Sequence, residues 1–242
     1  MYDFNQNPTA LWNSLIKQGL SPSITTIEEY NTRIVEGTIR ARQYLAAEKA
    51  VYGLTSSQIK KAHEHLFTGI YDWAGKFRKI GVEVAVGQHR GADSRAISYE
   101  IELARRQYGK MLDKAAQPNR LSSEILLMGA LAFYHARLIL IQPFLDRNKV
   151  FMRTILAQQF SELTGGNAEL TFKDIRAYGQ TLDAAVAGDL APLTRYLIAK
   201  ADHRVGNFTL RTPFRMAPLP VTRLHPSITQ ALNTTMFRAT PT

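Results

Sequence analysis

The feature that most constrains the fold is the stretch SSEILLMGALAFYHARLILI (122–141), which is apolar on nearly every side. A helix that is apolar all round must be surrounded by other helices, so this stretch predicts the central helix of a bundle. The next eight residues, QPFLDRNK (142–149), lead through a polar turn, Asp146 to Lys149, into a second apolar segment that ends at Leu163. The pattern therefore predicts two core helices joined by a short loop, whose polar turn contains an acid, an amide and two bases.

Helical periodicity also dominates the rest of the chain as far as residue 201. Helices are predicted over 7–18, 25–53, 56–70, 93–114, 150–163, 172–187 and 189–201. Thr25 and Glu28 have the spacing of a capping box at the start of the second helix. Gly37 lies inside the same helix and allows a break there, because glycine costs about 1 kcal/mol relative to alanine in a helix.

One segment and one end of the chain depart from this pattern. In KIGVEVAVGQ (79–88), β-branched residues alternate along the chain, which predicts a hairpin or extended flap around Val84, Ala85 and Val86. Residues 202–242 contain five arginines, one acidic residue and five of the ten prolines. We expect a domain over residues 1–201, with its core at about 28–200, followed by a basic extension over 202–242.

Composition limits the partners and the chemistry. Thirty basic against twenty acidic residues give a net charge of +10, which favours an acidic or phosphorylated partner. The chain has no cysteine and therefore no disulfide, thiol nucleophile or cysteine-based zinc site. The N-terminus lacks a signal-peptide profile, and we expect no segment that approaches the ~20 apolar residues of a membrane span. These features predict a cytoplasmic protein without a membrane partner.

Two segments resemble the Fic/Doc superfamily. They are GIYDWAGKFRKIGV (69–82) and IQPFLDRNKVFMR (141–153). The family signature is His-Pro-Phe-x-Asp/Glu-Gly-Asn-Gly-Arg-x-x-Arg in a loop between two buried helices, with an upstream aromatic-Trp-Ala-Gly segment that leads into a flap. The resemblance extends over roughly residues 28–200. It implies an all-α Fic-type helical bundle with a small β-hairpin flap, to which this chain adds a basic, proline-containing C-terminal extension.

The resemblance also implies an activity. Family enzymes use ATP and Mg²⁺ to transfer AMP to a hydroxyl group of a target protein. The histidine accepts the hydroxyl proton, the acid holds Mg²⁺, and the glycine-rich backbone holds the phosphates together with the asparagine and the last arginine. By this correspondence Asp146 would hold Mg²⁺, and Asn148 and Arg153 would bind the nucleotide.

Four working positions of the signature differ in this chain. Gln142 replaces the histidine, Arg147 and Lys149 replace the two glycines, and Val150 replaces the first arginine. Gln142 cannot act as a general base and could simply form a hydrogen bond at the helix end. Arg147 and Lys149 could attract phosphate as point charges or fill the anion cradle with their side chains. Asp146 could hold the metal or cap the following helix.

TRIVEG, Thr32 to Gly37, resembles the Ser/Thr-x-x-x-Glu-Gly/Asn inhibitory motif of the family. The resemblance implies an ion pair between Glu36 and Arg153, and the alternative is a solvated glutamate on a helix. The histidines do not indicate a metal site. His63 and His65 are two residues apart and point to different helix faces, and His135 is expected to be a core histidine.

We therefore expect a degenerate Fic-domain protein whose AMP transfer is lost or weak. Such a protein would bind a protein partner and a nucleotide. The family resemblance implies a bacterial origin, and a translocated effector is one such kind of protein. One alternative is an active AMP transferase with a non-standard loop. A second alternative is a nucleic-acid-binding protein that uses the basic extension.

Overall fold

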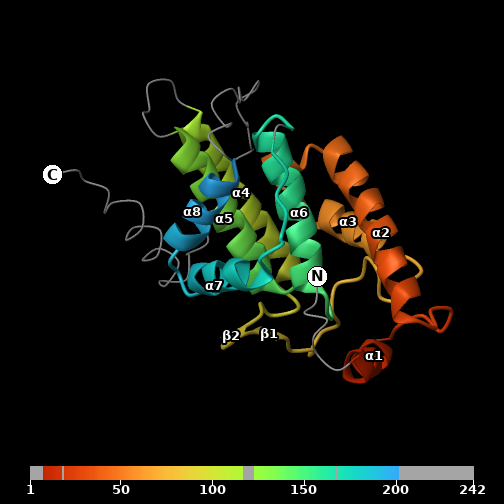
Figure 1. Cartoon of the computed structure of the whole chain (residues 1–242). Coiled ribbons are helices and arrows are strands. Elements are labelled where there is room, and N and C mark those ends of the chain that lie inside the picture. The colour runs from red at the N-terminus through yellow and green to blue at the C-terminus, as the bar shows by residue number, and fades with distance from the viewer. Residues whose placement is uncertain (1–7, 18, 117–122, 167, 202–242) are drawn as a thin grey trace.

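A computed structural model of the chain describes residues 8–17, 19–116, 123–166 and 168–201. These residues form a helical bundle with one small hairpin, which confirms the predicted all-α class (Figure 1). The α-helices are α1 (Pro8–Lys17), α2 (Ile27–Ala47), α3 (Ser56–Phe67), α4 (Ile97–Ala115), α5 (Ser123–Ile141), α6 (Asn148–Leu163), α7 (Ile175–Val186) and α8 (Ala191–Ala201). A 3-10 helix, η1, spans Ala50–Tyr52. The predicted extension, 202–242, lies outside the described residues.

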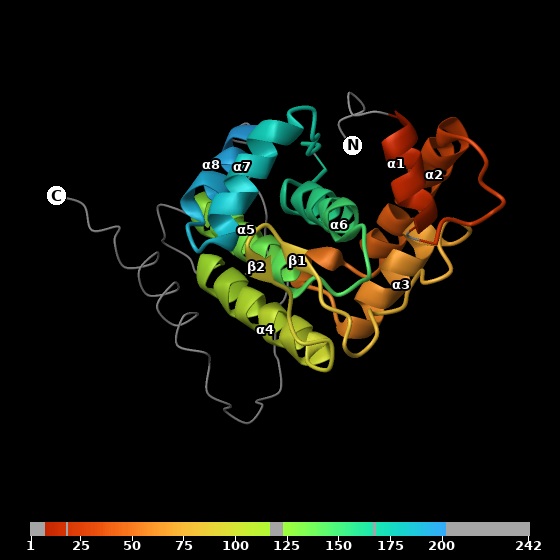
Figure 2. The same ribbon diagram turned by 90° about the horizontal axis from the view of Figure 1, so that it is seen from below.

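Helix α5 lies at the centre of the bundle, as its apolar sequence predicts. It contacts α4, α6, α7 and α8, and Figure 2 shows these helices around it. The window Glu124–Ile141 is long and apolar enough to cross a membrane, so our expectation that no segment approaches a membrane span was wrong on length and composition. In the structure 67% of that window is buried inside the protein, where it forms the core.

Helix α2 differs from the prediction at its start, in its middle and at its end, since it ends at Ala47 and the separate η1 follows where the helix was expected to continue toward residue 53. Its N-cap is Thr26, one residue later than predicted, and the Thr26 side chain accepts a hydrogen bond from the Glu29 backbone N–H. The helix continues unbroken through Gly37, which is buried. A Cβ atom at Gly37 would lie 1.9 Å from the Leu66 carbonyl oxygen, so this glycine lets α2 approach α3 closely. The allowed helix break does not occur, because tertiary packing at this position outweighs the helix propensity.

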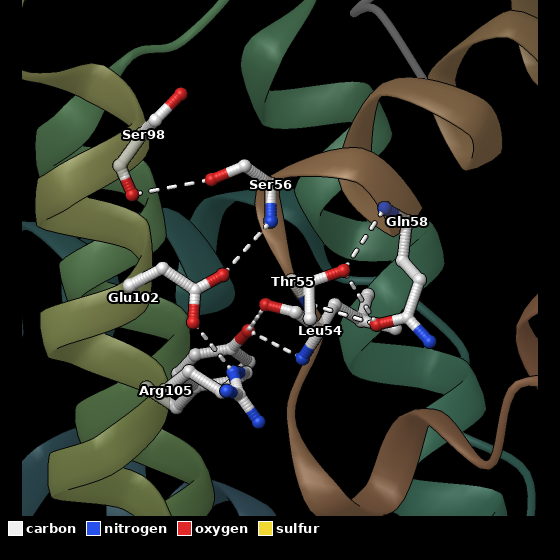
Figure 3. Close-up of polar contacts among 8 residues, drawn as sticks. Leu54, Thr55, Ser56, Gln58, Ser98, Glu102 and Arg105 are labelled. Carbon is white, nitrogen blue, oxygen red and sulfur yellow. Dashed lines mark hydrogen bonds and ion pairs between the residues drawn. The ribbon is translucent and has the colours of Figure 1, made fainter.

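The start of α3 is tied to α4 by a polar cluster (Figure 3). Thr55 and Gln58 form a capping box, in which the Thr55 hydroxyl accepts from the Gln58 N–H and the Gln58 side chain accepts from the Thr55 N–H. Glu102 of α4 accepts a hydrogen bond from the Ser56 N–H at 3.2 Å and pairs with Arg105 at 2.9 Å. A carboxylate near a helix N-terminus is stabilised by the helix dipole, so this cluster orients α3 against the core.

The hairpin consists of β1 (Ala85–Val86) and β2 (His89–Arg90), joined by a two-residue turn. The strands are antiparallel, with Ala85 opposite Arg90 and Val86 opposite His89. This confirms a hairpin at Val84–Val86, although it is shorter than the predicted segment. Figure 1 shows it at the end of the bundle where α5 ends and α6 begins.

Candidate functional site

The α5–α6 loop turns sharply at two residues with left-handed backbone conformation. Gln142 has a φ of 47° directly after α5, and Arg147 has a φ of 58° directly before α6. This conformation is uncommon for residues other than glycine. Both residues nevertheless adopt it, so the chain keeps a sharply turned loop between two buried helices where the sequence predicted one.

The Gln142 side chain is buried and directed back at its own helix. Its Nε2 donates a hydrogen bond to the Ile139 carbonyl oxygen at 2.7 Å, and the residue is only 6% exposed. The Gln142 Cβ lies 3.1 Å from the position that a Cβ on Gly91 would occupy, so the base of the flap covers it. The structure agrees with the expectation that Gln142 forms a hydrogen bond at the helix end.

Arg78 holds the flap and the loop together, and sequence reasoning missed it. Its Nε donates to the Gln142 carbonyl oxygen at 2.8 Å, and one terminal nitrogen donates to the Val82 carbonyl oxygen at 2.7 Å. The other terminal nitrogen donates to the Ala92 carbonyl oxygen, and the Arg78 N–H donates to the Pro143 carbonyl oxygen. Burial lowers the pKa of the guanidinium. The only sequence signal was a basic residue three positions after the Trp-Ala-Gly segment.

Asn148 closes the loop on itself. Its side-chain oxygen accepts from the Phe144 N–H at 3.0 Å, and its Nδ2 donates to the Phe144 carbonyl oxygen at 2.9 Å. The Phe144 ring stacks on His63 with ring centroids 3.6 Å apart. His63 in turn accepts a hydrogen bond at Nδ1 from the Gly75 N–H at 3.0 Å, and burial lowers its pKa well below the usual value. The loop therefore rests on α3 and on the Trp-Ala-Gly segment through these contacts.

Arg147 lies beneath the loop. Its side chain is 1% exposed, its Nε donates to the Tyr71 hydroxyl oxygen at 3.1 Å, and the same nitrogen is 3.7 Å from Asp146 Oδ2. Burial raises the pKa of Tyr71, while the Arg147 charge acts in the opposite direction. Arg147 therefore does not present its charge to solvent, and Tyr71 serves as its support as well as packing against Trp73, with ring centroids 4.6 Å apart.

These residues are a poor site for Mg²⁺. Asp146 Oδ2 is buried and accepts no hydrogen bond from the described residues, but it already faces the Arg147 guanidinium. Mg²⁺ keeps several waters when it binds and repels a neighbouring positive charge. No group of three His, Asp or Glu side chains suitable for a metal ion occurs among the described residues. Asp146 also makes no capping bond to α6, whose N-cap residue is Arg147.

Two further predicted residues lie on α6. Lys149 is exposed in the first turn. Arg153 is half-buried, with its guanidinium carbon 5.7 Å from the centre of the Phe172 ring. Its positive charge, after burial, is the second cause that lowers the pKa of His135, to about 3. His135 Nε2 lies 2.6 Å from the Tyr178 hydroxyl oxygen, which agrees with the expected core histidine.

The expected pairing of Glu36 with Arg153 is not formed. Of the ion pairs among the described residues, none joins these two, and Glu36 is exposed on α2. Thr32 donates to the Glu28 carbonyl oxygen within its own helix, and Gly37 packs on α3. The conformation described here therefore fits the alternative, a solvated glutamate, and gives the glycine of this motif a packing role.

Known proteins support the fold. The family model "Fic/DOC family" matches residues 53–160. An ADP-bound Fic domain of a VirB-translocated effector from Bartonella quintana has a TM-score of 0.55 and 13% identity, and the match covers 75% of this chain and 88% of that one. The AMPPNP-bound BepC protein from Bartonella tribocorum has a TM-score of 0.53 and 12% identity, covering 81% and 88%.

A similar structure also occurs outside bacteria. Fic-1 from C. elegans has a TM-score of 0.51 and 20% identity, and the match covers 80% of this chain and 55% of that one. Among curated proteins, none matches this chain in sequence. At these identities the structural matches establish the fold, and the matched segment includes both motifs. The chain therefore has the Fic fold, and its residues 53–160 match the Fic/DOC family model.

Proposed function

We propose that this protein is a degenerate Fic-domain protein that binds a partner protein and a nucleotide but has lost AMP transfer or performs it weakly. The observation that supports this most directly is the state of Gln142. Its amide cannot accept a proton near neutral pH, and its Nε2 is already bonded to Ile139. Loss of a general base removes typically 10²–10⁴ in rate.

The proposal of a nucleotide ligand rests on the N-terminus of α6. Arg147, the N-cap residue, makes no side-chain cap, so the first N–H groups of a sixteen-residue helix are available to an anion. Lys149 is exposed in the same turn and adds a positive charge. The related Bartonella domains contain ADP and AMPPNP, which makes an adenine nucleotide the ligand to test first.

The proposal of a protein partner rests on the hairpin. Ala85 and the β2 residues His89 and Arg90 are exposed, and a two-stranded sheet has edges with backbone groups that another strand can bond. The hairpin base is fixed to the end of α5, where the α5–α6 loop begins, by the Ala92 N–H, which donates to the Ile141 carbonyl oxygen at 3.2 Å. A partner strand at the hairpin would therefore lie next to the loop.

Incubation with α-labelled ATP and a cell lysate tests the loss of AMP transfer. We expect little or no labelling by the wild type, and none gained in Gln142→His, because a base alone does not orient the nucleotide. The quadruple variant Gln142→His, Arg147→Gly, Lys149→Gly, Val150→Arg rebuilds the family signature and should label more than the single variant.

The alternative, an active transferase, predicts the opposite result. It would keep Asp146, Asn148 and Arg153 as ligands and use a base other than residue 142. Strong labelling by the wild type that disappears in Asp146→Ala would establish that alternative. Binding of ADP to the wild type, measured by calorimetry, tests the nucleotide ligand separately from transfer.

A further inference from the structure

In the Fic family, Mg²⁺ is expected beside the acid of the loop, and in this chain a positively charged side chain, Arg147, lies beside the corresponding Asp146. Arg147 stands where the family signature has glycine, and its guanidinium is buried under the loop, with Nε 3.7 Å from Asp146 Oδ2. A glycine would suit the φ of 58° better, so the left-handed conformation gives no reason for an arginine here. The side chain must account for it.

The geometry of the pair leaves a divalent ion little to gain. Mg²⁺ binds carboxylate oxygens at 2.0–2.1 Å, so an ion on Asp146 Oδ2 would lie within about 6 Å of Arg147 Nε, whatever its direction. At such a distance the fixed positive charge of Arg147 repels the positive charge of a metal ion, by the same electrostatic effect through which neighbouring charges shift a pKa. Oδ2 is also inaccessible to the waters that Mg²⁺ retains.

The guanidinium is held in this position by a second contact. Tyr71 is 3% exposed, and its hydroxyl accepts the Arg147 Nε–H at 3.1 Å. The Tyr71 ring stacks on Trp73, so its position is fixed by the Trp-Ala-Gly segment. Swinging Arg147 out to admit a metal would break the Tyr71 bond and expose a buried side chain.

We propose that Arg147 takes the place of a divalent cation beside Asp146, so that the α5–α6 loop does not bind Mg²⁺ and a nucleotide binds there without it. The nucleotide part of this inference rests on the proposed function, whereas the replacement of the metal ion by Arg147 does not depend on it. The exposed Lys149 and the uncapped start of α6 remain to attract the phosphates. The positive charge beside Asp146 would then come from an arginine side chain, whereas in a metal-dependent nucleotide site it comes from a metal ion at the same place.

The first experiment measures Mn²⁺ binding to the full chain by electron paramagnetic resonance, without nucleotide. At millimolar Mn²⁺ we expect the wild type to show no Mn²⁺ binding that is lost when Asp146 is changed to asparagine. Arg147→Met keeps a buried side chain but removes the charge, and should bind Mn²⁺ at least about tenfold more tightly. Adding Asp146→Asn to that variant should abolish the gain. Arg147→Gly, which suits the left-handed backbone, serves as a second variant if the methionine variant does not fold.

The second experiment measures ADP binding by calorimetry in EDTA and in Mg²⁺. We expect dissociation constants within about twofold of each other for the wild type, and tighter binding in Mg²⁺ than in EDTA for Arg147→Met. Asp146-dependent Mn²⁺ binding by the wild type, or none in either Arg147 variant, would overturn the replacement of the metal. Absence of ADP binding in every condition would refute the nucleotide part of the proposed function, while the Mn²⁺ result still decides the role of Arg147.

Discussion

At the scale of single residues, two buried histidines make stability depend on pH. Burial lowers the pKa of His63 well below 6.5 and that of His135 to about 3. Both rings accept or share hydrogen bonds in the core, from the Gly75 N–H and with the Tyr178 hydroxyl. Between the folded and unfolded pKa values the unfolded chain binds protons that the folded chain does not, so the folded state loses stability as pH falls.

We therefore expect the free energy of unfolding to decrease from pH 6.5 to pH 5, by at most about 1.4 kcal/mol per pH unit for each of the two histidines. The stabilisation is fully present above pH 6.5. Urea unfolding at several pH values measures it, and His135→Gln should reduce the slope by about half. Burial raises the pKa of Glu162, so this residue changes the stability with pH in the opposite direction, and it does so equally in the wild type and in His135→Gln. Equal slopes in wild type and variant would contradict a neutral His135.

At the scale of elements, Gly37 decides how closely α2 packs on α3. Because a Cβ there would lie 1.9 Å from a backbone oxygen of α3, Gly37→Ala must push the helices apart. We expect a loss of about 1–3 kcal/mol in unfolding free energy, since overpacking outweighs the gain in helix propensity. The control is Gly179→Ala within α7, where a Cβ would meet nothing within 4 Å, and which should stabilise by about 0.4–1 kcal/mol. Thermal melts of both variants compare them directly.

The flap is a second element whose behaviour depends on one residue. Arg78 donates to both stems of the flap and to the Gln142 carbonyl oxygen, so Arg78→Met should free the flap base from the loop. We expect the amides of Gly91 and Ala92 to exchange with solvent at least about tenfold faster, while amides in α7 are unchanged. Arg95→Met is the matched control, because Arg95 forms only an exposed pair with Asp93 in the same segment and should change little. Equal exchange rates of the Gly91 and Ala92 amides in the two variants would contradict the role of Arg78 in fixing the flap base to the loop.

At the scale of the whole molecule, one core joins the described helices. It runs from Ile24 to Ala201, with α5 at its centre. The extension 202–242 contributes four of the ten net positive charges, and the domain boundary is predicted near residue 201. Nucleic-acid binding through the extension is the alternative function that this division isolates.

We expect a chain of residues 1–201 to keep the Tm of the full chain within about 3 °C, because the core lies within it. Circular dichroism melts measure this. If the extension binds nucleic acid, the full chain should bind single-stranded DNA with an affinity that falls steeply with salt, and the shortened chain should not. A shortened chain that does not fold would disprove the boundary at residue 201.

The sequence by itself determined the helices, the central place of α5 and the loop between α5 and α6. These depend on patterns within a few turns of helix: the all-round apolar stretch 122–141, the Thr55 cap, and the polar turn 146–149 between two apolar segments. Such patterns decide burial and local conformation directly, because the periodicity of a helix fixes which side chains share a face. The Fic resemblance was visible for the same reason, since both of its motifs are short and continuous.

Only the tertiary structure decided what the residues of the loop contact. The bond from Arg78 to Gln142 joins residues 64 positions apart, and that from Arg147 to Tyr71 joins residues 76 apart. Whether Arg147 turns to phosphate or to a buried hydroxyl, and whether Glu36 reaches Arg153, depends on how helices pack, which no local pattern specifies. The unbroken α2 has the same cause: glycine has a low helix propensity, but at Gly37 the missing side chain lets the backbone of α3 approach closely.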